Sequence, residues 1–400
     1  MSNHPFAHID AQWRAAEQLL AGYTGDMPFP AYLKIFFREN PRFGARDRRR
    51  VSAFCYAFFR LGRALEHISL RERILAGFFF CADDAAAAFE ILRPEWVIAA
   101  SGDLDVRITW LQQAYPGFSL HQVFPLSDQV SVGIAVDRFV CSHFAQPDLF
   151  IRIRPGKRDR VLRSLDAAGI AHRIVGEHAL AFDNATNLEC LGPPDRDYVV
   201  QDLSSQGTAS LLPEQPGDSP LVWDACAGSG GKSIMISDHY EKLRLFVSDI
   251  RPSILSNLQQ RFQRAGIRAE RMQVIDLADP ASARAASLLP GAGADCIIAD
   301  VPCSGSGTWG REPWMLSRFT LQDLEGYTAK QRAILAGVVP HLKPGGYLLY
   351  MTRSAYAMEN EMMAAHIASA YGLTCEVQGV LEGYESRADT MYAARFRRRL

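Results

Sequence analysis

Four short apolar segments in the second half of the 400-residue chain each end on an aspartate. Segments with helical periodicity follow the first two, so the pattern alternates between strand, turn and helix. This alternation predicts a doubly wound α/β sheet, which binds ligands in the crevice at the carboxyl ends of its strands. The four segments are 221–224, 245–249, 272–276 and 295–300, and we expect their last residues to line that crevice: Asp224, Asp249, Asp276 and Asp300.

The turn after the first of these strands is rich in glycine and reads Ala225-Cys-Ala-Gly-Ser-Gly-Gly-Lys232. Such a turn lets backbone amides approach a ligand, but its spacing fits neither the phosphate-binding loop nor the dinucleotide fingerprint well. The acids around the crevice would repel a phosphate, whereas an acid at the end of the second strand suits the hydroxyls of a ribose. S-Adenosylmethionine has a ribose and no phosphate. We therefore predict it as the cofactor, with a dinucleotide as the alternative.

A thiol lies in the turn after the fourth strand, which reads Asp300-Val-Pro-Cys-Ser-Gly-Ser-Gly307. Pro302 fixes its own φ, and the glycines at 305 and 307 let the chain turn tightly beside a ligand. We interpret Cys303 as a thiol at the edge of the ligand site. The alternative is an ordinary buried cysteine, since free cysteine is among the most buried residue types.

The chain is long enough for two or three domains. Residues 1–145 have helical periodicity and are predicted to form a helical domain. Residues 146–215 are predicted to form a small basic α+β unit, and residues 216–400 the doubly wound domain. A basic cluster at the start of one predicted helix, Arg46 with residues 48–50, is either a solvated helix start or an edge that contacts phosphates.

Basic side chains also follow a predicted strand and the start of the next helix in the α+β unit. Bases arranged in this way are what a surface that tracks a nucleic-acid backbone needs. The alternative is a solvated face. We predict contacts with RNA from Arg152, Arg154, Lys157 and Arg158, and a phosphate contact from Arg311.

Composition argues against several classes of protein. No apolar run approaches the about 20 residues of a membrane span, and the first five residues lack the basic start of a signal peptide. The 8 cysteines are scattered without metal-ligand spacing, which favours free thiols in a reducing compartment over disulfides or zinc. A net charge of −1 by itself says nothing about nucleic-acid binding, so that binding must be judged from local clusters of charged residues. We expect a cytoplasmic monomer without a membrane or metal partner.

Four motifs in order resemble the RsmB/Sun (Fmu) family of S-adenosylmethionine-dependent RNA cytosine-5 methyltransferases. They are the glycine-rich turn from Asp224, the turn from Asp300, Glu359-Asn-Glu361 and the upstream Gln201-Asp-Leu-Ser-Ser-Gln206. The resemblance is strong from about residue 201 onward. It weakens in the basic unit, which resembles the family's RNA-binding segment, and is faint in the helices, which the resemblance would assign to its NusB-like domain. It implies a Rossmann-like methyltransferase domain that forms 5-methylcytosine in ribosomal or other structured RNA, including transfer RNA.

The resemblance also implies roles for individual residues. Asp249 would hold the ribose hydroxyls of the cofactor, Asp276 its adenine end, and Asp300 its methionine end or the target base. The glycine-rich turn would line the methionine and ribose side through Cys226, Ala227, Gly228, Ser229, Gly230, Gly231 and Lys232.

In this family, a thiolate adds to carbon 6 of cytosine and thereby makes carbon 5 nucleophilic. Two cysteines usually share the work, and the attacking one lies in a Thr-Cys-Ser turn after the fifth strand. Here that turn reads Thr352-Arg353-Ser354, and arginine has no nucleophilic lone pair at neutral pH. We favour Cys303 as the nucleophile, with the positive charge of Arg353 lowering its pKa. The alternatives are a catalytically silent relic that binds cofactor and RNA, and a methyltransferase for another acceptor.

Overall fold

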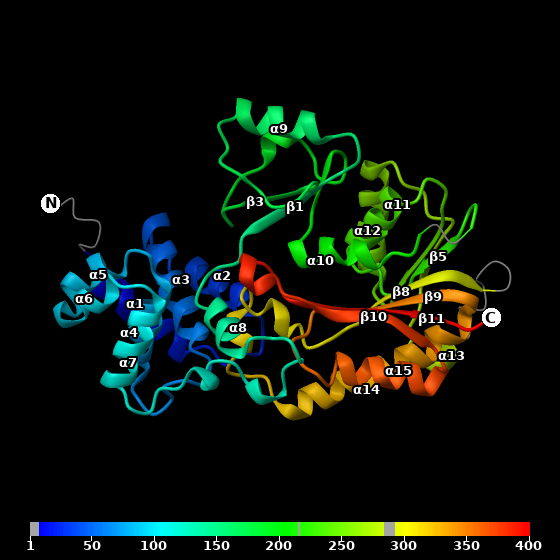
Figure 1. Cartoon of the computed structure of the whole chain (residues 1–400). Helices are drawn as coiled ribbons and strands as arrows, with labels where there is room; N and C mark the ends of the chain where they lie inside the picture. The colour runs from blue at the N-terminus through cyan, green and yellow to red at the C-terminus, as the bar shows by residue number, and fades with distance from the viewer. Residues whose placement is uncertain (1–7, 215–216, 284–292) are drawn as a thin grey trace. The chain divides into compact units, whose positions relative to one another are not determined.

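The computed structural model describes residues 8–214, 217–283 and 293–400, which form two compact units (Figure 1). The helical unit contains residues 8–128, Val136–Ala145 and Trp309–Thr320. The sheet unit contains Gln129–Ala135, Gln146–Thr308 and Leu321–Leu400. The first five residues, on which the signal-peptide prediction rests, lie outside the described part of the chain.

The helical unit is organised around aromatic side chains. The buried rings of Phe29 and Phe59 meet edge to face, with centroids 4.6 Å apart. The Trp309 ring lies 5.4 Å from that of Phe124 and 5.0 Å from that of Phe319, so the segment that carries it belongs to this unit. The helices are α1 (Ile9–Ala21), α2 (Phe29–Glu39), α3 (Ala45–Arg60), α4 (Leu70–Cys81), α5 (Ala85–Leu92), α6 (Val97–Ala100), α7 (Leu104–Ala114) and α8 (Val136–Ser142).

The sheet unit contains two sheets, and the smaller one has four strands in the order β2-β3-β1-β4, all paired antiparallel. Its apolar side chains pack under one helix, where Val161 and Leu165 meet Ile151 and Leu180. This is the basic α+β part of the chain. Its elements are β1 (Leu149–Ile153), α9 (Arg158–Ala167), β2 (Arg173–Ile174), β3 (Ala179–Phe182) and β4 (Tyr198–Val200).

The larger sheet has seven strands in the order β10-β11-β9-β8-β5-β6-β7. Neighbouring strands from β9 to β7 are parallel, and β11 is antiparallel to both of its neighbours. Helices α11 and α12 cover one face of the sheet, and α14 and α15 cover the other (Figure 1). The prediction of a doubly wound α/β fold is therefore confirmed.

The strands of this sheet are β5 (Leu221–Asp224), β6 (Arg244–Asp249), β7 (Arg271–Val274), β8 (Ala294–Asp300), β9 (Leu342–Thr352), β10 (Thr374–Leu381) and β11 (Met391–Arg397). The helices are α10 (Leu203–Gly207), α11 (Gly231–His239), α12 (Pro252–Ala265), α13 (Pro280–Ala283), α14 (Leu321–Val338) and α15 (Glu361–Tyr371). One expected strand end is wrong: β7 ends at Val274, so Asp276 lies two residues beyond it.

Candidate active site

Three of the predicted aspartates end adjacent parallel strands. Asp300 ends β8, Asp224 ends β5 and Asp249 ends β6, and these strands are neighbours in the sheet. The charges of Asp300 and Asp249 both act on the carboxyl group of Asp224. The structure therefore brings these carboxylates to one edge of the sheet, and Asp276 follows the next strand, β7.

Asp224 is the most buried of these acids, with 1% of its surface exposed. The Ser233 hydroxyl donates to its Oδ2 at 2.6 Å, whereas Oδ1 is buried without a hydrogen-bond partner among the described residues. Burial is the main cause that raises the pKa of this carboxyl to about 7, and the charge of Asp300 adds to it. The site thus contains one buried oxygen that can accept a hydrogen bond from a ligand.

The glycine-rich turn packs closely against its neighbours, which leaves no room for a side chain at one of its glycines. Gly230 has a φ of +83°, and a Cβ atom there would lie 1.9 Å from Cδ1 of Leu258. Gly228 also has a positive φ, and its N–H donates to Oδ2 of Asp249 at 3.0 Å. Burial raises the pKa of the Cys226 thiol, which therefore stays protonated as a packing residue in the same turn.

Asp249 is fully engaged with its neighbours. Its Oδ1 accepts from the backbone N–H of Arg251 at 2.9 Å and from Nε of the same residue at 3.0 Å. Burial alone would raise the pKa of Asp249, but the hydrogen bonds from Arg251 and Gly228 outweigh it and hold the pKa below its ordinary value. Because the Arg251 side chain is 59% exposed, a ligand hydroxyl could replace it on this carboxylate.

Lys232 pairs with Asp300 in the interior. Its Nζ lies 2.6 Å from Oδ2 of Asp300, and Lys232 is only 5% exposed. The same Nζ is 3.5 Å from the Ser205 hydroxyl, which also accepts from the side chain of Gln201 at 3.2 Å. Lys232 is therefore held by the protein, and the motif residue Gln201 takes part in the polar network around it.

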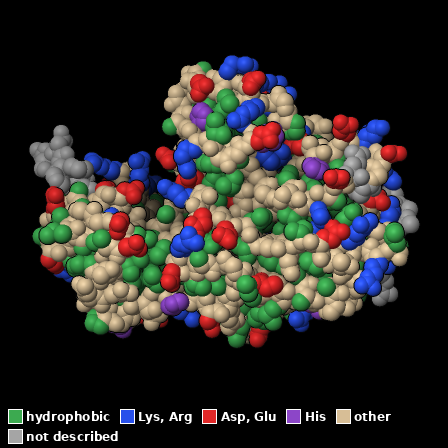
Figure 2. All heavy atoms as spheres, in the orientation of Figure 1, with side chains coloured by type: hydrophobic (Ala, Val, Ile, Leu, Met, Phe, Trp, Pro, Cys, Tyr) green, Lys and Arg blue, Asp and Glu red, His purple; other side chains and the backbone are tan. Residues whose placement is uncertain are grey.

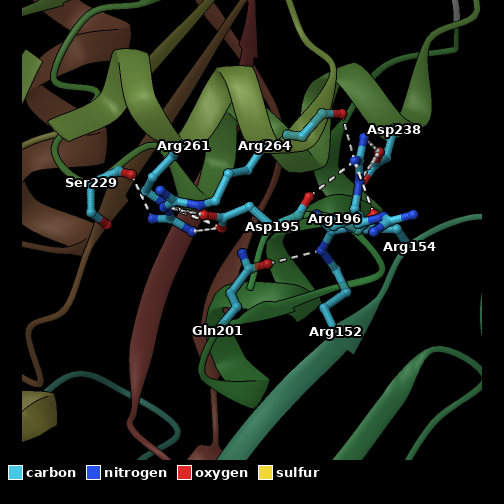
Figure 3. Close-up of polar contacts among 10 residues, drawn as sticks. Arg152, Arg154, Asp195, Arg196, Gln201, Ser229, Asp238, Arg261 and Arg264 are labelled. Carbon is cyan, nitrogen blue, oxygen red and sulfur yellow. Dashed lines mark hydrogen bonds and ion pairs between the residues drawn. The ribbon is translucent and has the colours of Figure 1, made fainter. Parts of the chain in front are cut away.

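Arg152 and Arg154 do not have the position expected of RNA contacts (Figure 3). Nη1 of Arg152 lies 2.7 Å from Asp238 of α11, and its Nε donates to Gln201 at 2.9 Å. Arg154 pairs with the same aspartate at 2.8 Å and donates to the carbonyl of Ala265 at 2.6 Å. Alternate residues of a strand face one side, and here that side is covered by α11 and α12. These arginines join the two sheets of the unit instead.

A second set of contacts joins the small sheet to the glycine-rich turn (Figure 3). Asp195 is completely buried and accepts from Arg261 at 2.5 Å and from Arg264 at 2.8 Å, both on α12. Arg261 also donates to the backbone carbonyl of Ser229 at 2.5 Å. The position of the turn therefore depends on a loop of the basic α+β part.

The remaining predicted RNA contacts lie in different places. Lys157 and Arg158 are half-buried near the start of α9, where Arg158 donates to the carbonyl of Glu177. Lys and Arg side chains gather over this helix at the top of the space-filling view (Figure 2). Arg163 of the same helix is exposed. Arg311 belongs to the helical unit and is half-buried there.

Cys303 lies beside the turn that follows β9. The backbone N–H of Arg353 donates to its Sγ at 3.2 Å. Burial and the charge of Glu359 raise the pKa of this thiol to about 12, although hydrogen bonds from the backbone of Gly305 and Arg353 oppose them. The expectation that the Arg353 charge gives Cys303 a low pKa is therefore wrong, because burial outweighs the lowering contributions.

The loop that carries Cys303 is held by the buried carboxylate of Glu359. This carboxylate accepts from the backbone N–H of Ser304 at 2.9 Å and from its hydroxyl at 2.5 Å, and from Gln331 of α14 at 2.8 Å. Burial, as the largest cause, raises the pKa of Glu359. The motif at 359–361 indicated that this acid matters, whereas Gln331 lies in no motif and could not be recognised.

The guanidinium of Arg353 lies at the end of β9 with its side chain exposed. It forms no hydrogen bond or ion pair with any residue that the structure describes. Burial would lower its pKa, but the carboxylates of Asp300, Asp389 and Asp202 outweigh this and raise the pKa. Arg353 is therefore a permanent cation that remains available to a ligand.

Two negative findings hold for residues 8–214, 217–283 and 293–400. No group of three or more histidines, cysteines or acids there is placed to hold a metal ion. None of the helices in these ranges is long and apolar enough to cross a membrane.

The strand order, the glycine-rich turn and the acids at the strand ends define a Rossmann-like methyltransferase fold. The structure is similar to the crystal structure of PH0851, with a TM-score of 0.67 and 18% identity over 99% of both chains. It is also similar to NSun6 from Pyrococcus horikoshii, crystallised with SFG, with a TM-score of 0.57 and 16% identity over 66% of this chain and 94% of that chain. These similarities indicate a shared fold.

Residues 209–374 match the family model described as "16S rRNA methyltransferase RsmB/F". The chain is 31% identical over 223 residues to the ribosomal RNA small subunit methyltransferase B of Erwinia tasmaniensis. The aligned region covers 54% of this chain and 50% of that protein. It thus spans about half the length of this curated relative. Residues 209–374 are thus similar to the RsmB/F family.

Replacing Gly307 with alanine should destabilise the site loop. Its N–H donates to the carbonyl of Arg353, and a Cβ atom at this position would lie 1.9 Å from the carbonyl oxygen of Thr390. We expect Gly307→Ala to lower the free energy of unfolding by about 2–4 kcal/mol. Gly326→Ala is the control, because nothing lies within 4 Å of a Cβ there and alanine favours the helix. Equal urea midpoints for both variants would contradict the geometry.

Asp224→Asn and Asp249→Asn should have opposite pH profiles. With its raised pKa, folded Asp224 keeps a proton that the unfolded chain releases above about pH 4, so its contribution to stability falls as the pH rises to 7. Asp224→Asn should therefore gain stability relative to wild type between pH 5 and 8, by about 4 kcal/mol at most. The lowered pKa of Asp249 stabilises the fold above pH 4, so Asp249→Asn should be less stable at pH 7 and approach wild type in acid. Urea unfolding across this range tests both.

Arg152→Met should affect folding more than RNA binding. It leaves Asp238 short of a partner in the interior, and breaking a buried ion pair costs about 3–5 kcal/mol. We expect a lower melting temperature with an unchanged salt dependence of RNA affinity. Arg163→Met on α9 is the matched control, and it should leave the melting temperature unchanged while it reduces the slope of log affinity against log salt by about 1. The reverse pattern would restore Arg152 as an RNA contact.

Proposed function

We propose that the protein binds S-adenosylmethionine at the carboxyl edge of the large sheet and methylates RNA. The observation that carries this proposal is the glycine-rich turn beside Asp224 and Asp249, in a chain whose residues 209–374 match a family model described as rRNA methyltransferases. SFG, the compound in the similar NSun6 structure, is an analogue of S-adenosylmethionine, which supports the choice of cofactor.

The residues at this edge fit the cofactor. The turn from Cys226 to Lys232 offers backbone groups without side-chain obstruction at its glycines, and the unpartnered Oδ1 of Asp224 suits the ammonium of the methionine moiety. Asp249 would take the ribose hydroxyls in place of the exposed Arg251 side chain. Asp276 would lie toward the adenine and Asp300 toward the methionine end. When bound, the cofactor supplies a methyl group on a cationic sulfonium.

We further propose carbon 5 of cytosine in ribosomal RNA as the acceptor and Cys303 as the nucleophile. The thiol must lose its proton, and with a pKa of about 12 this costs about 7 kcal/mol at pH 7. A further positive charge beside the thiol would lower that cost, and the cationic cofactor would supply one. Other structured RNA, including transfer RNA, is a further possible substrate. We place this activity in the cytoplasm and in a monomer.

The raised pKa of Cys303 and the exposed cation at position 353 also favour a second function, that of a catalytically silent protein that binds cofactor and RNA. The same observations fit methyl transfer to an acceptor other than cytosine, because that chemistry needs no thiolate.

Methyl transfer from radiolabelled S-adenosylmethionine to 16S ribosomal RNA and to transfer RNA separates these functions. We expect label in RNA with the wild type, none with Cys303→Ala, and 5-methylcytosine in the digested nucleosides. Arg353→Cys restores the family's thiol, so a gain in rate of tenfold or more would show an intact but idle site.

Cys375→Ala is the control, because that cysteine lies on β10, outside the candidate site. Label that survives in Cys303→Ala but appears in another nucleoside would support a different acceptor. Cofactor binding by calorimetry with no label in any RNA would support the silent protein.

A further inference from the structure

We propose that the helical unit carries a separate docking surface for the phosphate backbone of RNA. The proposal rests on the function proposed above, because it concerns the same RNA substrate. Its members, which we call the α2–α3 basic surface, are all exposed: Lys34, Arg38, Arg42, Arg46 and Arg49.

These side chains come from two consecutive helices and the turn between them. Lys34 and Arg38 are four residues apart on α2, and Arg46 and Arg49 are three apart on α3. Residues at these spacings share one face of a helix. Arg42 lies in the connecting turn, where its guanidinium is 5.5 Å from the centre of the Phe43 ring.

None of these five side chains forms an ion pair or hydrogen bond with any residue in the described ranges. Other arginines of the helical unit contrast with them, because acids or backbone carbonyls hold their guanidinium groups. Arg14 and Arg71 pair with Asp10, Arg93 pairs with Glu72, and Arg60, Arg63, Arg73, Arg107 and Arg318 donate to carbonyl oxygens. Unpaired cations are therefore concentrated between residues 34 and 49.

On α3 this arrangement works against helix stability, whereas on α2 Arg38 lies in the last turn, where the helix dipole favours a cation. Like charges three or four residues apart repel, and cations near a helix start are opposed by its dipole. The acids between residues 31 and 50 are Glu39 and Asp47, and Asp47 is already bonded to Gln12 and to the backbone of Gly44. The repulsion is thus little relieved within the unit, and a polyanion would relieve it.

A nucleic-acid backbone suits this surface better than other anions. Guanidinium groups bind phosphate oxygens in pairs, and a row of cations releases several counterions when it meets a row of phosphates. The whole chain has a net charge of −1, so general attraction to polyanions is absent and local clusters must supply the affinity. Lys and Arg side chains gather at the upper edge of the helical unit in the space-filling view (Figure 2).

The test compares two triple variants of the full-length protein that remove equal charge from the same unit. The first is Arg38→Gln with Arg46→Gln and Arg49→Gln, and the control is Arg14→Gln with Arg71→Gln and Arg93→Gln. Affinity for transcribed 16S ribosomal RNA is measured by fluorescence anisotropy at several salt concentrations. We expect the first variant to lose at least tenfold in affinity and to reduce the salt slope by about 2, because each phosphate contact contributes about 0.7. The control should stay within twofold of wild type.

Equal losses in both variants, or none in the first, would overturn the proposal. The proposal would also be overturned if the first variant lost binding to phosphatidylserine vesicles or to polyglutamate while its RNA affinity stayed unchanged. Unchanged melting temperatures establish that both variants are folded. Methyl transfer is measured on the same samples: a wild type that labels no RNA contradicts the proposed function, whereas the docking surface is judged by affinity and salt slope alone.

Discussion

The buried carboxylate of Glu359 determines where the candidate nucleophile can lie. It accepts hydrogen bonds from the backbone and hydroxyl of Ser304 and from Gln331, and so connects the loop after β8 with α14 and with the end of β9. Glu359 is completely buried, and an acid without these partners would be costly in that position. The same interaction places Cys303 beside the backbone of Arg353, and it also surrounds the thiol with groups that keep it protonated.

The chemistry at this edge is therefore a balance between burial and charge. Asp224 and Cys303 are both shifted by burial toward their neutral forms, whereas Asp249 and Arg353 keep their charges. A cationic cofactor would add a positive charge among these groups, which favours the ionised forms of the acid and the thiol.

Much of the fold followed from periodicity, because buried parallel strands are short apolar segments with a clear end. The ends of β5, β6 and β8 were predicted to the residue. The partners of Arg152 and Arg154 could not be predicted in the same way. The alternation of residues along a strand indicates that both side chains share one face of the strand, but it does not indicate which element covers that face. Their partner Asp238 lies more than 80 residues away in the sequence. The same limit applies to Trp309, whose partner Phe124 is still more remote in the sequence, and to Gln331, which lies in an ordinary helical pattern.

The hydrogen bonds between β1 and α11 have a consequence for how this chain can be divided. Arg152 and Arg154 share the carboxylate of Asp238, and Asp195 binds two arginines of α12. A fragment that starts after residue 215 would leave Asp238, Arg261 and Arg264 facing water where they now face partners. The small and large sheets thus form one structural unit. A protein that lost the small sheet would need different residues on α11 and α12 to keep the large sheet soluble.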